Sequence, residues 1–384
     1  MLPNELTSLH TKRGWIVTAA LFALFALIVP ALHVYLPQDS ALHVPGYLVQ
    51  LLGKFACYAV LALALDLIWG FTGILSLGQG VFFALGGYAM GMYLMRSIGK
   101  EGVYRSELPD FMVFLDWKEL PWYWQGFQSF PFAMLMTLLV PGALAWVFGF
   151  FAFRSRIRGV YFSIITQAMT FALMLLFFRN ETGFGGNNGM TDFKRILGYS
   201  LQETSTKVTL YVLTMLMLFG AYFACRFLVR SKAGRVLTAI RDAESKVMFC
   251  GYNPRDYKLF AWTFAAMLSG LAGALYVPQV GIINPSEMEP ANSIEMAIWV
   301  AVGGRGTLGG AVLGAGIVNG LKSFLTVTYP DAWLYALAAL FVLVTLLLPD
   351  GVAGVVAKLG ARFVRPQAVP APIRAAAEPT KGEV

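Results

Sequence analysis

The chain has 384 residues, of which 58% are hydrophobic and only 13% are charged, and its formal net charge is +8. A soluble domain carries about 25% charged residues, so this composition excludes an ordinary soluble protein and predicts a polytopic membrane protein. The basic residues are spread along the chain instead of forming one soluble domain, so membrane topology explains the charge better than nucleic-acid binding.

Ten apolar runs can be drawn, and most of them approach the ~20 residues that a helix needs to cross a bilayer. They cover residues 14–36, 46–69, 75–95, 129–152, 158–178, 208–229, 258–280, 286–303, 307–326 and 332–349. The eighth is the weakest, because Asn292 and Glu295 interrupt it, and it could be a half-helix or a re-entrant segment. We therefore expect an all-α transmembrane bundle of about ten spans, within a range of eight to ten. The first run resembles a signal peptide, but it is long and residues 33–37 make a poor small-residue cleavage site, so we interpret it as an uncleaved span.

A long charged stretch, residues 230–257, separates two of these runs. Its apolar positions fall on one face of a helix: Val236, Ile240, Ala243 and Val247. Gly251 and Asn253-Pro254 end the pattern. The stretch predicts a short amphipathic helix between two spans. Two interpretations are open at this point: a solvated surface helix, or a docking helix for a cytoplasmic partner.

Charge counts assign the loops to the two sides of the membrane. If residues 230–257 are cytoplasmic, 19 of the 29 lysine and arginine residues share their side and 9 lie on the opposite side, which satisfies the positive-inside rule. Both termini are then cytoplasmic, and the loops at 96–128 and 179–207 lie outside. We expect residues 1–360 to form a single transmembrane domain and the Ala- and Pro-rich residues 361–384 to be a disordered cytoplasmic tail.

No motif for enzymatic chemistry is present in the sequence. It has no G-x-x-x-x-G-K-[ST] motif for ATP and no H-E-x-x-H motif for zinc. The predicted spans contain few charges, chiefly Lys54, Asp66 and Glu295, and these are too few for an ion-coupling relay. The energy for any transport therefore has to come from another subunit.

Glycines gather in two segments, residues 70–91 and 303–320, each of which forms a turn that opens a span. We expect them to let helices pack closely or to act as hinges. The glycines concerned are Gly73, Gly78, Gly80, Gly87, Gly91, Gly306, Gly310 and Gly314. The resemblance between SLGQG and TLGGA in the two segments hints at internal duplication.

Uncharged polar side chains inside or beside the spans could line a path for a neutral solute. They are Ser76, Gln79, Ser163, Thr166 and Gln167, with Asn187 and Asn188 on the outer rim. For any one of them, a hydrogen bond between helices is an equally good explanation.

Four segments taken together resemble a known family. They are GFTGILSLGQGVFFALGGYAMGMYL (70–94), RGVYFSIITQAMTFAL (158–173), SKAGRVLTAIRDAESKVMFCGYN (231–253) and SIEMAIWVAVGGRGTLGGAVLGAGIVNGL (293–321). Their order and content resemble the branched-chain amino-acid ABC permease family. ETGFGGNNGMTDF (181–193), with its doubled asparagine, is similar to the urea branch of that family.

This resemblance implies a subunit of a bacterial inner-membrane importer. Such a subunit works with a second permease, two cytoplasmic ATPases that bind ATP and Mg²⁺, and a periplasmic solute-binding protein; no cofactor is expected in this chain. The resemblance also implies that residues 230–257 hold a coupling helix seated on the ATPase. The residues to which that role carries over are Arg235, Ala239, Ile240, Arg241, Asp242, Glu244 and Gly251. Asp66 departs from the asparagine common in relatives, so no role for it can be transferred.

Three functions stay open. The first is ATP-driven import of urea, a small neutral solute that suits a path of uncharged polar groups. The second is import of a branched-chain amino acid or short amide, although a zwitterion should need countercharges and few are evident. The third is a passive channel or secondary transporter, which would work without ATPase partners.

Overall fold

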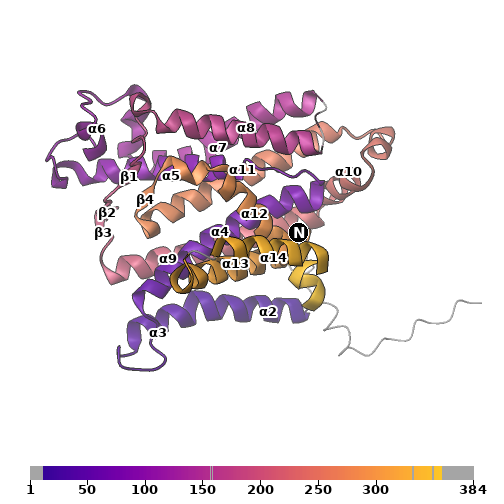
Figure 1. Ribbon diagram of the computed structural model, residues 1–384, viewed down its shortest axis with the longest axis horizontal. Helices are drawn as coiled ribbons and strands as arrows, with labels where there is room; N and C mark the ends of the chain where they lie inside the picture. The colour runs from indigo at the N-terminus through magenta and orange to yellow at the C-terminus, as the bar shows by residue number, and fades with distance from the viewer. Residues whose placement is uncertain (1–11, 156, 158, 331–332, 348–349, 357–384) are drawn as a thin grey trace, which may run out of the picture.

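The computed structural model describes residues 12–155, 157, 159–330, 333–347 and 350–356. The described chain is mostly helical, as expected for an all-α membrane protein (Figure 1). The helices are α2 (Lys12–Phe22), α3 (Val29–Tyr35), α4 (Gly46–Thr72), α5 (Gln79–Ile98), α6 (Asp110–Phe114), α7 (Phe130–Arg154), α8 (Val160–Phe178), α9 (Thr204–Arg230), α10 (Lys232–Phe249), α11 (Pro254–Val280), α12 (Pro290–Gly303), α13 (Leu308–Thr328) and α14 (Trp333–Leu347). A π-helical turn (Ala23–Ile28) joins α2 to α3, and four short 3₁₀ segments cover Gly99–Glu101, Trp122–Gln128, Asn180–Thr182 and Pro285–Met288.

Eight helical segments in the described residues are long and apolar enough to cross a membrane. They are Gly14–Tyr35, Gly46–Thr72, Gln79–Glu101, Phe130–Arg154, Val160–Phe178, Thr204–Arg230, Pro254–Val280 and Leu308–Thr328. This number lies at the lower end of the predicted range. The weak eighth run forms only the 14-residue helix α12, and the tenth forms the 15-residue α14.

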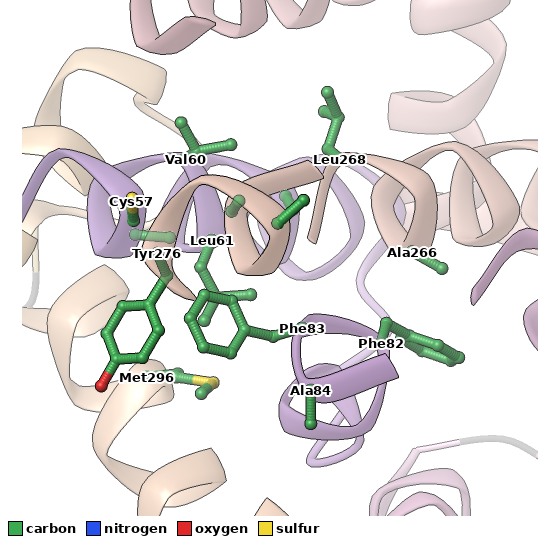
Figure 2. Close-up of a cluster of buried hydrophobic side chains, with 14 of the residues drawn as sticks. Cys57, Val60, Leu61, Phe82, Phe83, Ala84, Ala266, Leu268, Tyr276 and Met296 are labelled. Atoms are coloured by element: carbon green, nitrogen blue, oxygen red, sulfur yellow. The ribbon is translucent and has the colours of Figure 1, made fainter. Parts of the chain in front are cut away.

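The core of the bundle lies between α4, α5 and α11, which bury most of their residues, whereas the other candidate spans bury a third of theirs or less. Figure 2 shows Leu61 of α4, Phe83 of α5 and Tyr276 of α11 meeting in one apolar cluster. The backbones of α5 and α11 also lie in contact at Gly86 and Gly270. A Cβ at Gly86 would clash with the main chain of Gly270. These two glycines allow a close crossing that the sequence reading did not identify.

Four short strands lie at one end of the bundle, opposite α10 (Figure 1). β1 (Met190–Thr191) pairs antiparallel with β4 (Ile282–Ile283), and β2 (Arg195–Ile196) forms a hairpin with β3 (Tyr199–Ser200). The first pair attaches the Gly/Asn-rich loop to the chain that follows α11.

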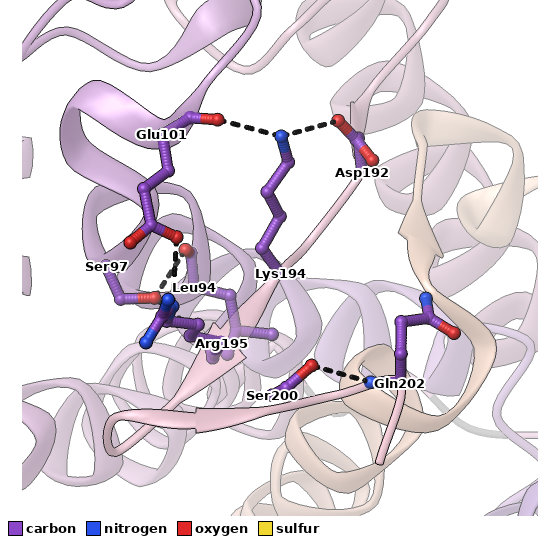
Figure 3. Close-up of polar contacts among 8 residues, drawn as sticks. All are labelled: Leu94, Ser97, Glu101, Asp192, Lys194, Arg195, Ser200 and Gln202. Atoms are coloured by element: carbon purple, nitrogen blue, oxygen red, sulfur yellow. Dashed lines mark hydrogen bonds and ion pairs between the residues drawn. The ribbon is translucent and has the colours of Figure 1, made fainter.

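Polar contacts bind the two long loops of that end to each other. Lys194 donates to the carbonyl of Glu101 at 2.8 Å, and Arg195 donates to the Glu101 carboxylate at 2.9 Å (Figure 3). Trp124 is buried and donates its indole N–H to the carbonyl of Gly183. Both predicted loops therefore lie at the same end, opposite residues 230–257. The predicted tail at 361–384 lies outside the described residues.

Candidate functional site

The helix predicted within residues 230–257 is present as α10, which begins directly after the 27-residue α9. The hydroxyl of Ser231 accepts the backbone N–H of Gly234 and caps its first turn. The helix is broken at Ala243, where φ is −157° and ψ is 72°. The buried face also differs from the predicted one. Leu237, Ile240 and Val247 are buried, while Val236 and Ala243 are only partly covered.

Arg241 is the contact between α10 and the first glycine segment. Its Nη1 donates to the carbonyl of Gly70 at 2.7 Å. Its Nε donates to Asp242 at 2.8 Å, and this hydrogen bond lowers the pKa of the Asp242 carboxyl. Gly73 ends α4 with φ of 75°, and a Cβ there would lie 2.9 Å from the Arg241 side chain. Only glycine combines this backbone conformation with such a close approach.

The second glycine segment meets the same point. The backbone N–H of Gly306, whose φ is 77°, donates to the carboxylate of Asp66 at 2.6 Å. Arg305 places its guanidinium 5.4 Å from the ring centroid of Trp69. Asp66 and Gly306 lie 240 residues apart in the sequence. Their hydrogen bond therefore joins the two glycine segments beside Arg241. Sequence reasoning left Asp66 without a role, and the structure makes it the hydrogen-bond acceptor of this junction.

The remaining predicted coupling residues fall into two groups. Arg235 and Ala239 are exposed and line a shallow groove of about 860 Å³ together with Asp242. Glu244 instead faces α11, where it pairs with Lys258 at 2.7 Å. Gly251 ends the segment with φ of 82°. One surface of the segment therefore stays open while the other is fixed to the bundle.

Between α4 and α5 the chain leaves the helical conformation, although its apolar residues led us to expect a span from residue 75. Ser163 of α8 donates to the carbonyl of Leu75 at 2.8 Å, and Thr166 accepts the N–H of Leu77 at 3.1 Å. The hydroxyl of Ser76 accepts the N–H of Gly78. These three hydroxyls satisfy a non-helical backbone at membrane depth, which a lipid environment requires. Their geometry favours the structural alternative, and their role in a path stays a prediction.

Gln79 begins α5 in the interior of the bundle. Its Oε1 accepts the hydroxyl of Ser269 at 2.8 Å, and both residues are buried. Since Ser269 lies near the middle of the 27-residue α11, α5 starts about halfway along that helix. A helix that starts halfway across a membrane directs the positive end of its dipole into the interior.

The helix α12 starts close to the same place. A Cβ at Gly80 would lie 3.0 Å from the backbone oxygen of Glu287 and 3.2 Å from the hydroxyl of Ser293. The Nε2 of Gln79 and the hydroxyl of Ser293 are buried without a hydrogen-bond partner among the residues that the structure describes. Unsatisfied buried polar groups are costly, so this place is a candidate binding site for a polar solute.

The other predicted path residues are not part of this cluster. Gln167 is half-buried on α8, and Asn187 and Asn188 are exposed in the loop at the strand end. Ser269 and Ser293 were missed, because a single serine in an apolar run carries no distinguishing pattern.

The remaining predicted glycines lie at close contacts. Gly87 and Gly91 pack against Ile283, and Gly78 packs against Thr166 and Met169. Gly310 and Gly314 approach the backbone of α12, where a Cβ at Gly314 would clash with the carbonyl of Trp299. This geometry suits close helix packing, and a hinge role for any of them stays a prediction.

Comparison with known proteins identifies the class. Residues 47–347 match the family described as "Branched-chain amino acid transport system / permease component". The chain therefore belongs to this family of permease components, which are transport subunits and not enzymes.

Three relatives show the range of the similarity. The permease protein LivM of the high-affinity branched-chain amino acid transport system of Escherichia coli (strain K12) is 25% identical over 317 residues, which cover 77% of this chain and 67% of that protein. The corresponding permease protein BraD of Pseudomonas aeruginosa is 22% identical over 324 residues, 80% of this chain and 96% of BraD. The Autoinducer 2 import system permease protein LsrC of Enterobacter sp. (strain 638) is 29% identical over 231 residues, 58% of this chain and 64% of LsrC. No solved structure matches the chain.

Proposed function

We propose that this chain is one membrane-spanning half of an ATP-driven importer. It works with a second, related permease, two cytoplasmic ATPase subunits that bind ATP and Mg²⁺, and a periplasmic binding protein that delivers the solute. The observation that carries the proposal is the contact of Arg241 with Gly70 beside the Asp66–Gly306 junction. Through it, a displacement of α10 reaches both glycine segments at once.

The proposed mechanism is alternating access. Closure of the ATPase dimer displaces α10, whose groove at Arg235 and Ala239 is open to a partner. The helices that follow the two glycine segments, α5 and α13, then move relative to α4. The interior polar site at Gln79 and Ser293 faces the binding protein in one state and the cytoplasm in the other.

We assign the α10 end to the cytoplasm of a bacterial inner membrane. The charge count supports this orientation, since most lysine and arginine residues share the side of residues 230–257. The described chain also begins, at α2, on the side where α10 lies (Figure 1).

Urea is the first candidate for the cargo. The doubled asparagine at 187–188 lies in the segment that is similar to the urea branch of the family, and Gln79 and Ser293 are uncharged. A branched-chain amino acid or a short amide is the second candidate, and the names of LivM and BraD favour it. The name of LsrC shows that similar permeases serve a different solute.

The test is uptake into proteoliposomes that hold the complete importer, with [¹⁴C]urea and [¹⁴C]leucine as probes. We expect one of the two probes to accumulate. Its accumulation should require both the binding protein and ATP, with the ATP supplied on the side of the membrane that carries the ATPases. Full uptake without ATP hydrolysis would instead establish the passive channel or secondary transporter. Leucine uptake without urea uptake would reject urea and support the second candidate.

A further inference from the structure

A cluster of four charged side chains lies beside the interior polar site. Lys322 of α13 pairs with Glu295 of α12 at 2.7 Å. Glu287 accepts a hydrogen bond from the hydroxyl of Tyr276 at 3.0 Å. Lys54 of α4 lies 5.6 Å from the ring centroid of Tyr58.

This cluster changes the charge argument made from the sequence. The sequence analysis noted Lys54 and Glu295 as charges within predicted spans, and it gave no role to Glu287 in the eighth run or to Lys322 in the ninth. In the structure two cations and two anions converge, and the charges of Glu287 and Glu295 act on Lys54. Charges at membrane depth are costly, so a balanced set held in one place indicates function.

The pairing within the cluster is incomplete. Lys322 and Glu295 form a direct ion pair, but in the described ranges Lys54 has no carboxylate oxygen within 4.0 Å. Its ammonium instead lies 5.9 Å from the ring centroid of Tyr276, whose hydroxyl is bound to Glu287. A cation and an anion are thus held apart on either side of one aromatic side chain.

Two buried polar atoms in the same cluster also lack partners among the described residues. They are Oε1 of Glu295, an acceptor, and Nε1 of Trp299, a donor. The two side chains are about nine-tenths or more buried, with 7% and 3% of their surface exposed. The ring of Trp299 lies 5.0 Å from that of Tyr58, so the free donor belongs to the aromatic side of the cluster.

Three members of the cluster are not fully buried. Lys54, Tyr58 and Glu287 are half-buried, and they are not closed into the apolar core. Figure 2 shows the hydroxyl of Tyr276 directed away from Phe83 and Leu61, out of the apolar cluster. The backbone of Glu287 lies against Gly80, so the charged cluster continues directly from the site at Gln79 and Ser293.

We propose that Lys54, Glu287, Glu295 and Trp299 form a binding site for the polar head of the transported solute. The complementary chemistry is a small, net-neutral solute with N–H donors for the two carboxylates and an oxygen acceptor for Lys54 and Trp299. Urea and the head of an α-amino acid share this chemistry, and the aromatic rings of Tyr58 and Tyr276 offer a flat face to either. The assignment rests on the proposed importer function and names the solute contacts within it.

The test replaces single charges in the complete reconstituted importer. Glu287→Gln and Lys54→Gln are measured with [¹⁴C]urea and with [¹⁴C]leucine over a range of binding-protein concentrations. We expect uptake of the transported probe to fall at least about tenfold in efficiency, as expected for loss of a hydrogen bond to a charged group. The probe affected tells whether the site takes an amide or an amino-acid head.

Matched controls come from an ion pair at the strand end, Lys100 with Glu107 at 3.5 Å, both largely exposed. Lys100→Gln and Glu107→Gln should transport like the wild type. Wild-type uptake by both cluster variants would overturn the site and leave the importer function standing. Failure of the wild-type complex to accumulate either probe with ATP would instead reject the importer function itself.

If the charge variants assemble poorly, Trp299→Phe tests the proposed binding site instead. It keeps an aromatic ring beside Tyr58 and removes an N–H that has no partner in the described chain. A role in packing alone predicts unchanged uptake in the assembled complex. The proposed site predicts a several-fold loss of uptake with a normal amount of complex, and unchanged uptake would overturn it.

Discussion

The α10 end and the interior polar site differ in how far hydrogen bonds connect their polar groups across separate segments of the chain. At the α10 end, Arg241 is bonded to Gly70 and Asp242, and Oδ1 of Asp66 accepts the N–H of Gly306, while Oδ2 of Asp66 has no partner among the described residues. At the interior site, Gln79 and Ser293 keep buried polar atoms without partners in the part of the chain that the structure describes.

This difference indicates a division of work. A network that is bonded across three segments moves as a unit, so it can pass on a displacement. Unpaired polar groups in a buried site instead favour binding of a ligand, since water or solute has to supply their hydrogen bonds. The α10 end is therefore suited to mechanical coupling and the interior to binding.

The largest effect is expected from a change that separates the core helices, because it would disrupt the α10 end and the interior polar site together. In Gly86→Val the added atoms meet the backbone of Gly270, which cannot move unless α5 and α11 part. Overpacking of this kind costs about 1–3 kcal/mol or more. We expect the amount of assembled complex, measured by size-exclusion chromatography in detergent, to fall at least about tenfold.

Gly220→Val in α9 is the control, because a Cβ there meets no atom within 4 Å. It should leave the amount of complex unchanged. Equal assembly of the two variants would contradict the close crossing of α5 and α11.

Arg241→Ala should disrupt the coupling contact at the α10 end and leave the interior polar site intact. It removes the hydrogen bond to Gly70, and a bond to a charged group contributes about 1.5–3 kcal/mol. We expect solute uptake to fall at least about tenfold in proteoliposomes while the complex assembles and ATP hydrolysis continues. Arg255→Ala is the matched control, since Arg255 pairs only locally with Asp256 and contacts the ring of Phe150. Normal uptake by Arg241→Ala would refute the coupling contact.

Gln79→Leu should disrupt the interior polar site and leave the contacts at the α10 end intact. Leucine neither accepts the hydroxyl of Ser269 nor offers the free Nε2 atom. We expect uptake to fall about tenfold, with an unchanged amount of complex. Asn188→Leu, in the exposed outer loop, should lower uptake by only about twofold. Equal uptake kinetics for Gln79→Leu and the wild type would reduce Gln79 to a packing role.

The smallest effect is expected where a side chain only supports the backbone. Ser163→Ala loses one hydrogen bond to the carbonyl of Leu75, a contribution of about 1 kcal/mol. The midpoint of thermal unfolding of the solubilised complex should fall, while the apparent affinity for solute stays the same. A weaker apparent affinity at wild-type stability would place Ser163 in the path after all. Ser205→Ala, at an exposed position of α9, serves as the control.

The sequence predicted the helical class, the spans and the charged helix between them, because hydropathy and helical periodicity are local properties. It did not predict where α5 begins. Ile74, Leu75 and Leu77 are apolar and continue the run, but hydroxyls of α8 bind the backbone of this stretch in a non-helical form. Such tertiary hydrogen bonds have no signal in the stretch itself.

The candidate sites show the same limit. Arg241 was predicted through the family resemblance, but its partner Gly70 lies 171 residues away. Glu295 and Lys54 were noticed as charges within predicted spans, while Glu287, at the start of the weak eighth run, was given no role. Charges that meet only through the packing of α4, α12 and α13 cannot be recognised as one cluster from their positions in the chain.

The most direct test of the division of work is the number of ATP molecules hydrolysed per solute molecule imported, measured on one preparation of the reconstituted importer. For Arg241→Ala we predict a ratio at least about tenfold above the wild type, because hydrolysis continues without transmission to the glycine segments. Gln79→Leu should leave maximal coupling intact, with a wild-type ratio at saturating solute and a higher solute concentration for half-maximal uptake. A wild-type ratio in Arg241→Ala would contradict the account.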